Sequence, residues 1–409
     1  MKSPETKSAS TENSNGRCDL EVADIFRRYG EKYRADHDLT AEQHAAMFDI
    51  EHCRTSYYGY HVAACDECEF TDHSYNSCRN RNCPKCQGIA RRKWVAARLA
   101  DLLPVPYYHS IFTLPHVINP LVPFNKELFY EMIFECASQT LLNFGRDPKW
   151  LGAIVGFYGI LHSWGGKLWN HLHIHFIVPA GGVDDNGCWV APKHKGRFLF
   201  PVRAVSEVFR GKFVQQLKRA YYGGQLVLPD GYRHLSDSNR FERYIDALVG
   251  RDWNVHIKRP FSTPEKVVRY IGRYTHKIAI SNHRLIKVED DRVHFHFKNY
   301  RKNGRWEQTA LTAQAFIRRF LMHVLPEGFH KIRHYGFLAN GRSKVMVDKI
   351  RSQLDQAPVD EPESEPRTGR PCPQCTMGTM QAMVIFTQFY AIIKPGFRLA
   401  HMVMQHDSS

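Results

Sequence analysis

The segment NHLHIHFIV, Asn170 to Val178, places histidine at every second position of an otherwise apolar run. Successive side chains of a strand point to opposite faces, so His171, His173 and His175 share one face while the other face is apolar. Histidines two positions apart lie about 6.6 Å apart along a strand, and their rings can lean toward one ion. The segment predicts a half-buried strand, and its outer face is open to two interpretations, a metal site or a merely polar surface.

Strand-like and helix-like patterns surround this segment. Alternating apolar residues predict further strands at residues 107–114 and 292–300. Apolar residues at helical spacing predict helices at residues 127–144, 264–278 and 313–325. Strands and helices mixed in this way indicate an α+β fold, in which we expect an antiparallel sheet to form the floor of the site.

The order of these patterns divides the chain into five parts. Residues 1–17 are polar and predicted to be disordered. Residues 18–100 combine two helices with a segment rich in Cys and His, and residues 101–350 form the α+β domain. Residues 351–371 are acidic and rich in proline, as in a linker, and residues 372–409 form a tail that we expect to be dispensable.

Positive charge is concentrated in one region of the chain. Lys and Arg number 56 against 41 Asp and Glu, and the net charge is +15. Residues 251–350 hold 21 of the basic and 8 of the acidic residues, which suits a polyanionic partner such as DNA. A solvated basic surface is the simpler alternative. DNA contacts are predicted for basic residues of this region and of the Cys/His-rich segment: Arg79, Arg81, Lys258, Arg273, Lys277, Arg318, Arg319 and Arg333.

The sequence has no clear signal for export or membrane insertion. Its N-terminal segment lacks the apolar core of a signal peptide, and its most apolar segment, residues 151–164, is short and broken by glycines. A cytoplasmic location is therefore expected. In that reducing compartment, metal binding explains the 11 cysteines better than disulfides do.

Two CxxC pairs form the strongest local motif. CDEC contains Cys65 and Cys68, CPKC contains Cys83 and Cys86, and 14 residues separate the pairs, close to the spacing of zinc ribbons. Each turn directs two thiolates toward one point. The two turns are therefore predicted to complete a tetrahedron around a structural Zn²⁺.

Other cysteines leave the number of zinc ions open. Cys53, His61 and Cys78 could replace one of the four ligands or build a second site. Cys372 and Cys375 in the tail form only half a site. They could pair with upstream ligands, bridge two chains, or be two ordinary thiols.

The predicted helix near residue 264 carries two tyrosines. Thr263 can cap it, and Pro264 suits its first position. Tyr270 and Tyr274 lie one turn apart on one face, either as core residues or as reactive phenols. The basic residues on the same helix are unusual for a segment packed on all sides.

Paired tyrosines, basic neighbours and a histidine-bound metal are together suited to cutting DNA. A tyrosine oxygen can attack phosphorus in line while the metal stabilises the charge that develops on the phosphate. A phenol has a pKa of about 10 and needs a nearby positive charge, which the metal, Arg273 or Lys277 could supply. Two tyrosines would let one strand end stay attached while a second strand is cut.

These motifs resemble the two-tyrosine rolling-circle insertion-sequence transposases, which are HUH endonucleases (His, bulky hydrophobic residue, His). The resemblance runs from about residue 50 to residue 345, and the tail departs from the family pattern. The matching segments occur in the same order: SYNSCRNRNCPKCQ, FTLPH, HLHIHFIVPAGG, PFSTPEKVVRYIGRYTHKIAISN and FIRRFLMHVLPEGFHKIRHYGFLAN.

The resemblance implies a fold and roles for the site residues. The HUH motif falls on His173 and His175, with His171 as a neighbour, and the nucleophiles fall on Tyr270 and Tyr274. The implied fold is an antiparallel sheet flanked by helices, preceded by a small helical and zinc-ribbon-like module. The implied chemistry uses Mg²⁺ or Mn²⁺, single-stranded DNA ends and target, and a 5′-phosphotyrosine intermediate. Such a protein would act at the bacterial nucleoid.

Two points stay open at this level. Imidazole is a poor ligand for Mg²⁺, so a third ligand or the phosphate itself must supply hard oxygen, and His276 is one candidate for that ligand. The alternative functions are a plasmid or phage replication initiator or relaxase with the same chemistry, and a non-catalytic zinc-dependent DNA-binding regulator. The zinc module argues against the initiator, and the intact HxH motif with both tyrosines argues against the regulator.

Overall fold

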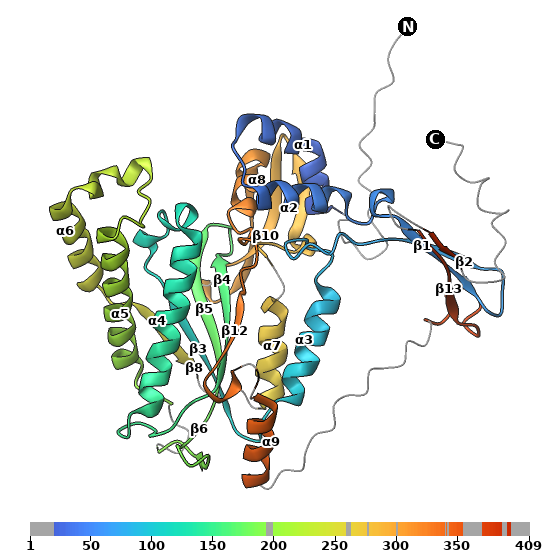
Figure 1. Cartoon of the computed structure of the whole chain (residues 1–409). Coiled ribbons are helices and arrows are strands. Elements are labelled where there is room, and N and C mark those ends of the chain that lie inside the picture. Colours follow the sequence, from blue (N-terminus) through green and yellow to red (C-terminus); the bar gives the residue numbers. More distant parts are fainter. Residues whose placement is uncertain are drawn as a thin grey trace. The chain divides into compact units, whose positions relative to one another are not determined.

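The computed structural model describes residues 20–193, 199–258, 263–275, 278–299, 302–339, 341, 343–354, 370–386 and 391–393. It consists of two compact units (Figure 1). The large unit is Gly88–Glu361, and the terminal unit combines Met1–Gln87 with Pro362–Ser409. None of the described helices has the length and apolar character needed to cross a membrane.

A five-stranded antiparallel sheet forms the centre of the large unit. Its strand order is β12-β4-β5-β3-β8. The strands are β12 (Ile332–Tyr335), β4 (Phe157–Trp164), β5 (Asn170–Pro179), β3 (Tyr107–Thr113) and β8 (Asn254–Lys258). The histidine segment is a strand, as its alternation predicts, and the pairing places it in the middle of the sheet.

Helices cover both faces of this sheet (Figure 1). One face is covered by α4 (Lys126–Arg146) and α5 (Val202–Tyr222), and α6 (Ser238–Val249) follows α5. The other face is covered by α3 (Gly88–Ala100), α7 (Pro264–Thr275) and α9 (Ser343–Gln353). This arrangement confirms the predicted α+β fold with an antiparallel sheet flanked by helices.

Alternation along β5 explains which face each helix layer covers. Phe176, on the apolar face, contacts Phe112 with ring centroids 5.6 Å apart, and Phe112 contacts Phe209 of α5 at 5.0 Å. Ile177, on the opposite face, lies in one buried cluster with Val268 of α7. The histidines share the face of Ile177, so the histidine face is the one that α7 covers.

A second, three-stranded sheet follows α7. Its order is β11-β10-β9, with strands β9 (Leu285–Glu289), β10 (Arg292–Asn299) and β11 (Arg305–Thr312), and α8 (Ala313–Leu321) packs on it. Three side chains from this region bond backbone oxygens of the loop between β4 and β5: Arg284 to Gly166, Arg319 to Lys167 and His323 to Leu168, at 2.6, 2.9 and 3.1 Å. A short hairpin, β6 (Gly182–Val183) and β7 (Trp189–Val190), follows β5.

The terminal unit contains two helices and a four-stranded sheet. The helices are α1 (Val22–Asp36) and α2 (Ala41–His52). A capping box starts α2, because the Thr40 and Gln43 side chains each bond the other's backbone amide. The sheet order is β14-β13-β1-β2, with strands β1 (Tyr60–Cys65), β2 (Thr71–Tyr75), β13 (Met380–Phe386) and β14 (Ala391–Ile393).

The observed units differ from the predicted domains. Helix α3, predicted as part of module 18–100, packs on α7 and belongs to the large unit. The tail, predicted as a separate part, pairs with β1 through β13. The predicted linker begins inside α9, which extends to Gln353. Its residues 355–369, like the predicted disordered segment 1–17, lie outside the described residues.

Candidate active site

Strand pairing brings a third histidine to the HxH motif. His162 of β4 lies directly opposite His173 of β5, and such pairs point to the same face of a sheet. The ligand nitrogens of His162, His173 and His175 all lie within 4.8 Å of one another. The ring centroids are 4.4 Å apart for His162 and His175 and 4.9 Å for His173 and His175. Three converging nitrogens fit one metal ion.

Hydrogen bonds at Nδ1 orient both rings of the HxH motif. Nδ1 of His173 lies 2.7 Å from the carbonyl oxygen of His171, to which it donates, so Nε2 keeps a lone pair. Nδ1 of His175 lies 2.7 Å from Nε2 of His109. When Nδ1 of His175 donates to His109, Nε2 of His175 is also available as a metal ligand.

The environment keeps these rings neutral. Burial lowers the pKa of His173 to about 3, with the neighbouring His171 adding to the effect. The pKa of His175 is well below its usual range because of burial and then of His162. Neutral imidazole is the form that binds metal, so the rings need not lose a proton at neutral pH.

His109 of β3 connects the histidines to helix α7. Its ring stacks on that of His175 with centroids 5.0 Å apart, and it meets the ring of Tyr270 edge-on at 5.9 Å. Burial lowers the pKa of His109 to about 4, with the charge of Lys258 adding to the effect. His109 thus contacts both Tyr270, the predicted nucleophile, and His175 of the HxH motif.

Helix α7 presents a buried face and a site-facing residue. Val267, Val268 and Ile271 are buried in the core, while Tyr270 is half-buried beside His109. The backbone of Tyr274 lies one turn further along the same helix. The side chains of Arg273 and Tyr274, and all of His276 and Lys277, lie outside the described residues.

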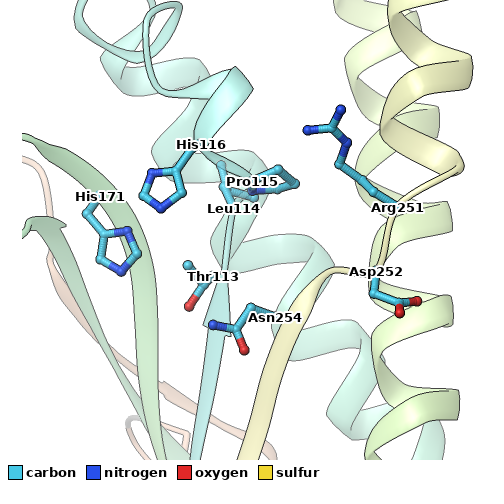
Figure 2. Close-up of a pocket in the computed structure, with 8 residues that line it drawn as sticks. All are labelled: Thr113, Leu114, Pro115, His116, His171, Arg251, Asp252 and Asn254. Carbon is cyan, nitrogen blue, oxygen red and sulfur yellow. The ribbon is translucent and has the colours of Figure 1, made fainter. Parts of the chain in front are cut away.

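A pocket adjoins the histidines (Figure 2). Its volume is about 270 Å³. In it the rings of His116 and His171 stack with centroids 5.5 Å apart, and Asn254 lies next to Thr113 across the β3–β8 pair. The remaining lining residues are Leu114, Pro115, Arg251 and Asp252. His171, the neighbour of the HxH motif, therefore lines this pocket and also holds His173 through its carbonyl.

His162 and His109 are site residues that the sequence does not reveal by itself. Both occupy strand segments, FYGILHSW and YYHSIFTL, in which one histidine among apolar residues gives a weak signal. His162 meets His173 because the register of the β4–β5 pairing shifts between His162 and Trp164, which spacing along the sequence does not show. No comparable local signal exists for His109, because its partners come from β5 and α7.

One cysteine cluster lies at the base of the β1–β2 hairpin. It combines Cys53 at the end of α2 and Cys78 after β2 with Cys83 and Cys86 of CPKC. The Sγ atoms of Cys53 and Cys86 are 3.2 Å apart, and those of Cys78 and Cys86 are 3.5 Å apart. Four converging thiols form a tetrahedral zinc site of the structural type.

The predicted single tetrahedron of CDEC and CPKC is wrong. CDEC lies at the tip of the hairpin, and strands of five or six residues hold tip and base roughly 16–20 Å apart. Cys65 and Cys68 instead converge with Cys372 and Cys375 of the tail. His61 belongs to no described cluster, and its Nδ1 lies 3.4 Å from Oδ1 of Asn76.

Comparisons with known proteins identify the family. The family model described as "Putative transposase" matches residues 156–345, and "Transposase zinc-binding domain" matches residues 25–114. The chain is 44% identical over 381 residues to "Putative transposase y4qJ" of Sinorhizobium fredii (strain NBRC 101917 / NGR234), covering 90% of this chain and 95% of that protein. The chain belongs to this transposase family.

A second relative gives the same result. The transposase for insertion sequence element IS801 of Pseudomonas savastanoi pv. phaseolicola is 29% identical over 312 residues, covering 75% of this chain and 72% of that protein. No solved structure matches the transposase. The family assignment means that the chain binds DNA and cuts and joins its strands, and that its N-terminal part holds structural zinc.

Six of the eight predicted DNA contacts of this transposase have described side chains, and these six divide into two groups. Arg79, Arg81, Lys258 and Arg318 are exposed and able to meet phosphate. Arg319 is engaged with the β4–β5 loop. The Arg333 guanidinium forms a two-point ion pair with Glu131, stacks on Phe134 at 4.3 Å and bonds the carbonyl of His330. These bonds favour a structural role for Arg319 and Arg333 over a DNA contact.

Proposed function

We propose that this transposase moves its insertion sequence by a rolling-circle mechanism, through single-stranded DNA and a covalent 5′-phosphotyrosine. The observation that carries the proposal is the contact chain from Tyr270 through His109 to His175. It sets a phenol beside three converging imidazoles on one face of a rigid sheet. This combination serves phosphoryl transfer and has no evident purpose in a protein that only binds DNA.

The proposed step exchanges one phosphate ester for another. The phenol oxygen of Tyr270 or Tyr274 attacks the scissile phosphorus as its proton is removed. The bond from phosphorus to the 3′ oxygen breaks, and that oxygen leaves with a proton as a free 3′-OH. Attack of a new 3′-OH on the phosphotyrosine reverses the step and joins two strands, so no external energy source is needed.

His162, His173 and His175 would hold the catalytic divalent ion. Bound there, Mg²⁺ or Mn²⁺ would act as a Lewis acid on the scissile phosphate. Imidazole nitrogens favour transition-metal ions over Mg²⁺, so Mn²⁺ is the better candidate of the two. The neutral rings of His173 and His175, held by their Nδ1 bonds, and the converging ring of His162 match the donor set that such an ion needs.

Lys258 would attract the phosphate and activate the tyrosine, and His109 would position the tyrosine. Lys258 of β8 lies opposite His109 of β3, is exposed, and shares the sheet face of the histidines. Its ammonium would attract the scissile phosphate to that face and favour the phenolate form of Tyr270. His109 would act as a positioning residue, because it touches both the HxH motif and the tyrosine.

The pocket beside the site favours a single-stranded substrate. A duplex would keep its bases stacked inside, whereas a single strand can turn a base outward. The stacked rings of His116 and His171 offer a base an aromatic surface, and the Asn254 amide can pair with a base edge. We propose that this pocket receives a nucleotide next to the scissile phosphate.

The test is adduct formation on single-stranded element ends in Mn²⁺. Wild type should yield a protein–DNA adduct whose 5′ end maps to Tyr270 or Tyr274. Each single Tyr→Phe variant should lose one class of adduct, and Tyr270→Phe/Tyr274→Phe should lose both, since phenylalanine has no nucleophile. Tyr222→Phe, which removes an exposed phenol of α5, is the matched control and should react like wild type.

Two results would count against the proposal. Adducts formed by the double variant would mean that another residue is the nucleophile. Wild type that binds the same ends tightly but neither nicks nor forms adducts, in Mn²⁺ or Mg²⁺, would indicate a non-catalytic DNA-binding role.

A further inference from the structure

We infer that Cys65 and Cys68, together with Cys372 and Cys375 of the tail, bind a second structural Zn²⁺. The tail lies outside both segments that the family models match. This site would make the zinc module discontinuous in sequence, closed by residues 304 and 310 positions apart. The inference does not depend on the proposed tyrosine chemistry.

The distances between the sulfur atoms fit a tetrathiolate zinc site. The Sγ atoms of Cys65 and Cys375 are 3.6 Å apart, and those of Cys68 and Cys372 are 3.8 Å apart. With Zn–S bonds of about 2.3 Å, the edge of a regular tetrahedron is about 3.8 Å. A disulfide would need about 2.05 Å, and all four cysteines are free thiols.

Both CxxC turns are built to hold thiolates. The Glu67 amide points at Sγ of Cys65 from 3.4 Å, and the Gly378 amide at Sγ of Cys375 from 3.3 Å. A Cβ at position 378 would lie only 2.4 Å from Sγ of Cys65, so glycine is needed where the two turns meet. Amides that donate to sulfur stabilise its negative charge, which favours the metal-bound state.

Strand pairing holds the tail against the hairpin. Strand β13 pairs antiparallel with β1, with Met380 opposite Cys65. Asp66 and Thr379 exchange two hydrogen bonds, in which the Thr379 amide donates to Oδ1 at 2.6 Å and the Asp66 amide to the Thr379 carbonyl at 3.2 Å. Arg370 forms an ion pair with Asp72 of β2. These contacts position the tail pair of cysteines before metal arrives.

The tail is therefore a structural part of the module and not dispensable. Among the side chains that the structure describes around the second cluster, the buried apolar ones are mainly Val62, Cys372 and Met380. In many small modules, metal binding supplies a constraint in addition to the apolar core. The terminal unit consists of an N-terminal segment that ends at Gln87 and a C-terminal segment that follows the large unit. The zinc would connect these two segments.

Zinc content of the full-length protein tests the inference. Elemental analysis should find two Zn²⁺ per chain in wild type. Cys372→Ser/Cys375→Ser and Cys65→Ser/Cys68→Ser should each lose one, and Cys53→Ser/Cys78→Ser should lose the other. Cys188→Ser is the matched control, because Cys188 is exposed and outside both clusters, and it should keep two.

A measurement on wild type removes the ambiguity of a variant that misfolds. Under brief alkylation of the native protein, Cys372 and Cys375 should stay unmodified while Cys188 reacts at once. A chelator strong enough to remove zinc should expose Cys372, Cys375, Cys65 and Cys68 together. One Zn²⁺ per wild-type chain, or rapid alkylation of Cys372 and Cys375 without chelator, would overturn the inference.

All four proposed ligands of this site belong to one chain. The Cys372→Ser/Cys375→Ser variant should therefore keep the oligomeric state of wild type in light scattering. A wild-type dimer that becomes a monomer in this variant would show that the tail ligates a second copy, contrary to the inference.

Discussion

At the scale of single residues, His162 is the position that the structure adds to the site. It lies opposite His173 and brings a third nitrogen to within 4.8 Å of ring nitrogens of the two HxH histidines. From the sequence, one candidate for the third ligand is His276 in the predicted helix 264–278, and this residue lies outside the described residues. A ligand from the neighbouring strand is more rigid than one from a helix end, because the sheet pairing holds it.

His162→Ala should weaken the transposase's use of metal. Losing one of three imidazoles should raise the Mn²⁺ concentration for half-maximal nicking by at least about 10-fold, since even residues that only support ligands have effects of that size. Titration of Mn²⁺ in the nicking assay measures it. His294→Ala, on the three-stranded sheet and outside the described clusters, should match wild type. A His162→Ala enzyme with unchanged half-saturation would exclude His162 as a ligand.

At the scale of elements, the close packing of helix α7 on α3 requires a glycine at position 272. A Cβ at Gly272 would lie 2.4 Å from Cγ2 of Val95, so α3 and α7 approach each other closely at this point. The close approach holds α7 where Tyr270 meets His109. Periodicity predicted the helix, but it did not predict that α3 would be its neighbour.

Gly272→Ala should destabilise the large unit despite the higher helix propensity of alanine. We expect the clash to cost about 1–3 kcal/mol, more than the gain of up to ~1 kcal/mol in propensity. Urea unfolding of the full chain, followed by tryptophan fluorescence, measures the change. Gly211→Ala in α5, where a Cβ meets nothing within 4 Å, should instead be neutral or stabilising.

A double variant checks the cause. In a Val95→Ala background the added methyl has room, so Gly272→Ala should cost less there by about 0.5–3 kcal/mol, the usual coupling between residues in contact. Equal costs in both backgrounds would mean that the contact with Val95 is not the reason.

At the scale of the whole molecule, charge serves both DNA binding and folding. The net charge of +15 supports binding to a polyanion, yet Arg319 and Arg333 are held by protein groups. Arg79 and Arg81 are exposed and lie between Cys78 and Cys83, two cysteines of the cluster at the base of the β1–β2 hairpin. We therefore expect the zinc module to supply phosphate contacts that sequence composition assigned mainly to residues 251–350.

Salt dependence separates the two groups of arginines. On single strands, log K should fall with log salt by about 0.7 for each phosphate contacted. Arg79→Ala/Arg81→Ala should reduce that slope by about 1.4 in fluorescence anisotropy titrations, if each makes one contact. Arg333→Ala should leave the slope unchanged and lower stability instead, because it breaks the ion pair with Glu131. The opposite pattern would assign Arg333 to DNA.

The sequence by itself determined what depends on neighbouring residues. Alternation defined β5 and its histidine face, helical spacing defined α7 with Tyr270, and CxxC turns marked metal-binding cysteines. These patterns are local, because strand and helix geometry places residues two to four positions apart.

Only the tertiary structure decided which distant groups meet. The β4–β5 and β3–β5 pairings bring His162 and His109 to the HxH motif. The length of the β1–β2 hairpin separates CDEC from CPKC, and β13 brings the tail cysteines to CDEC. Such contacts depend on the register and order of strands far apart in the chain, which no local spacing encodes.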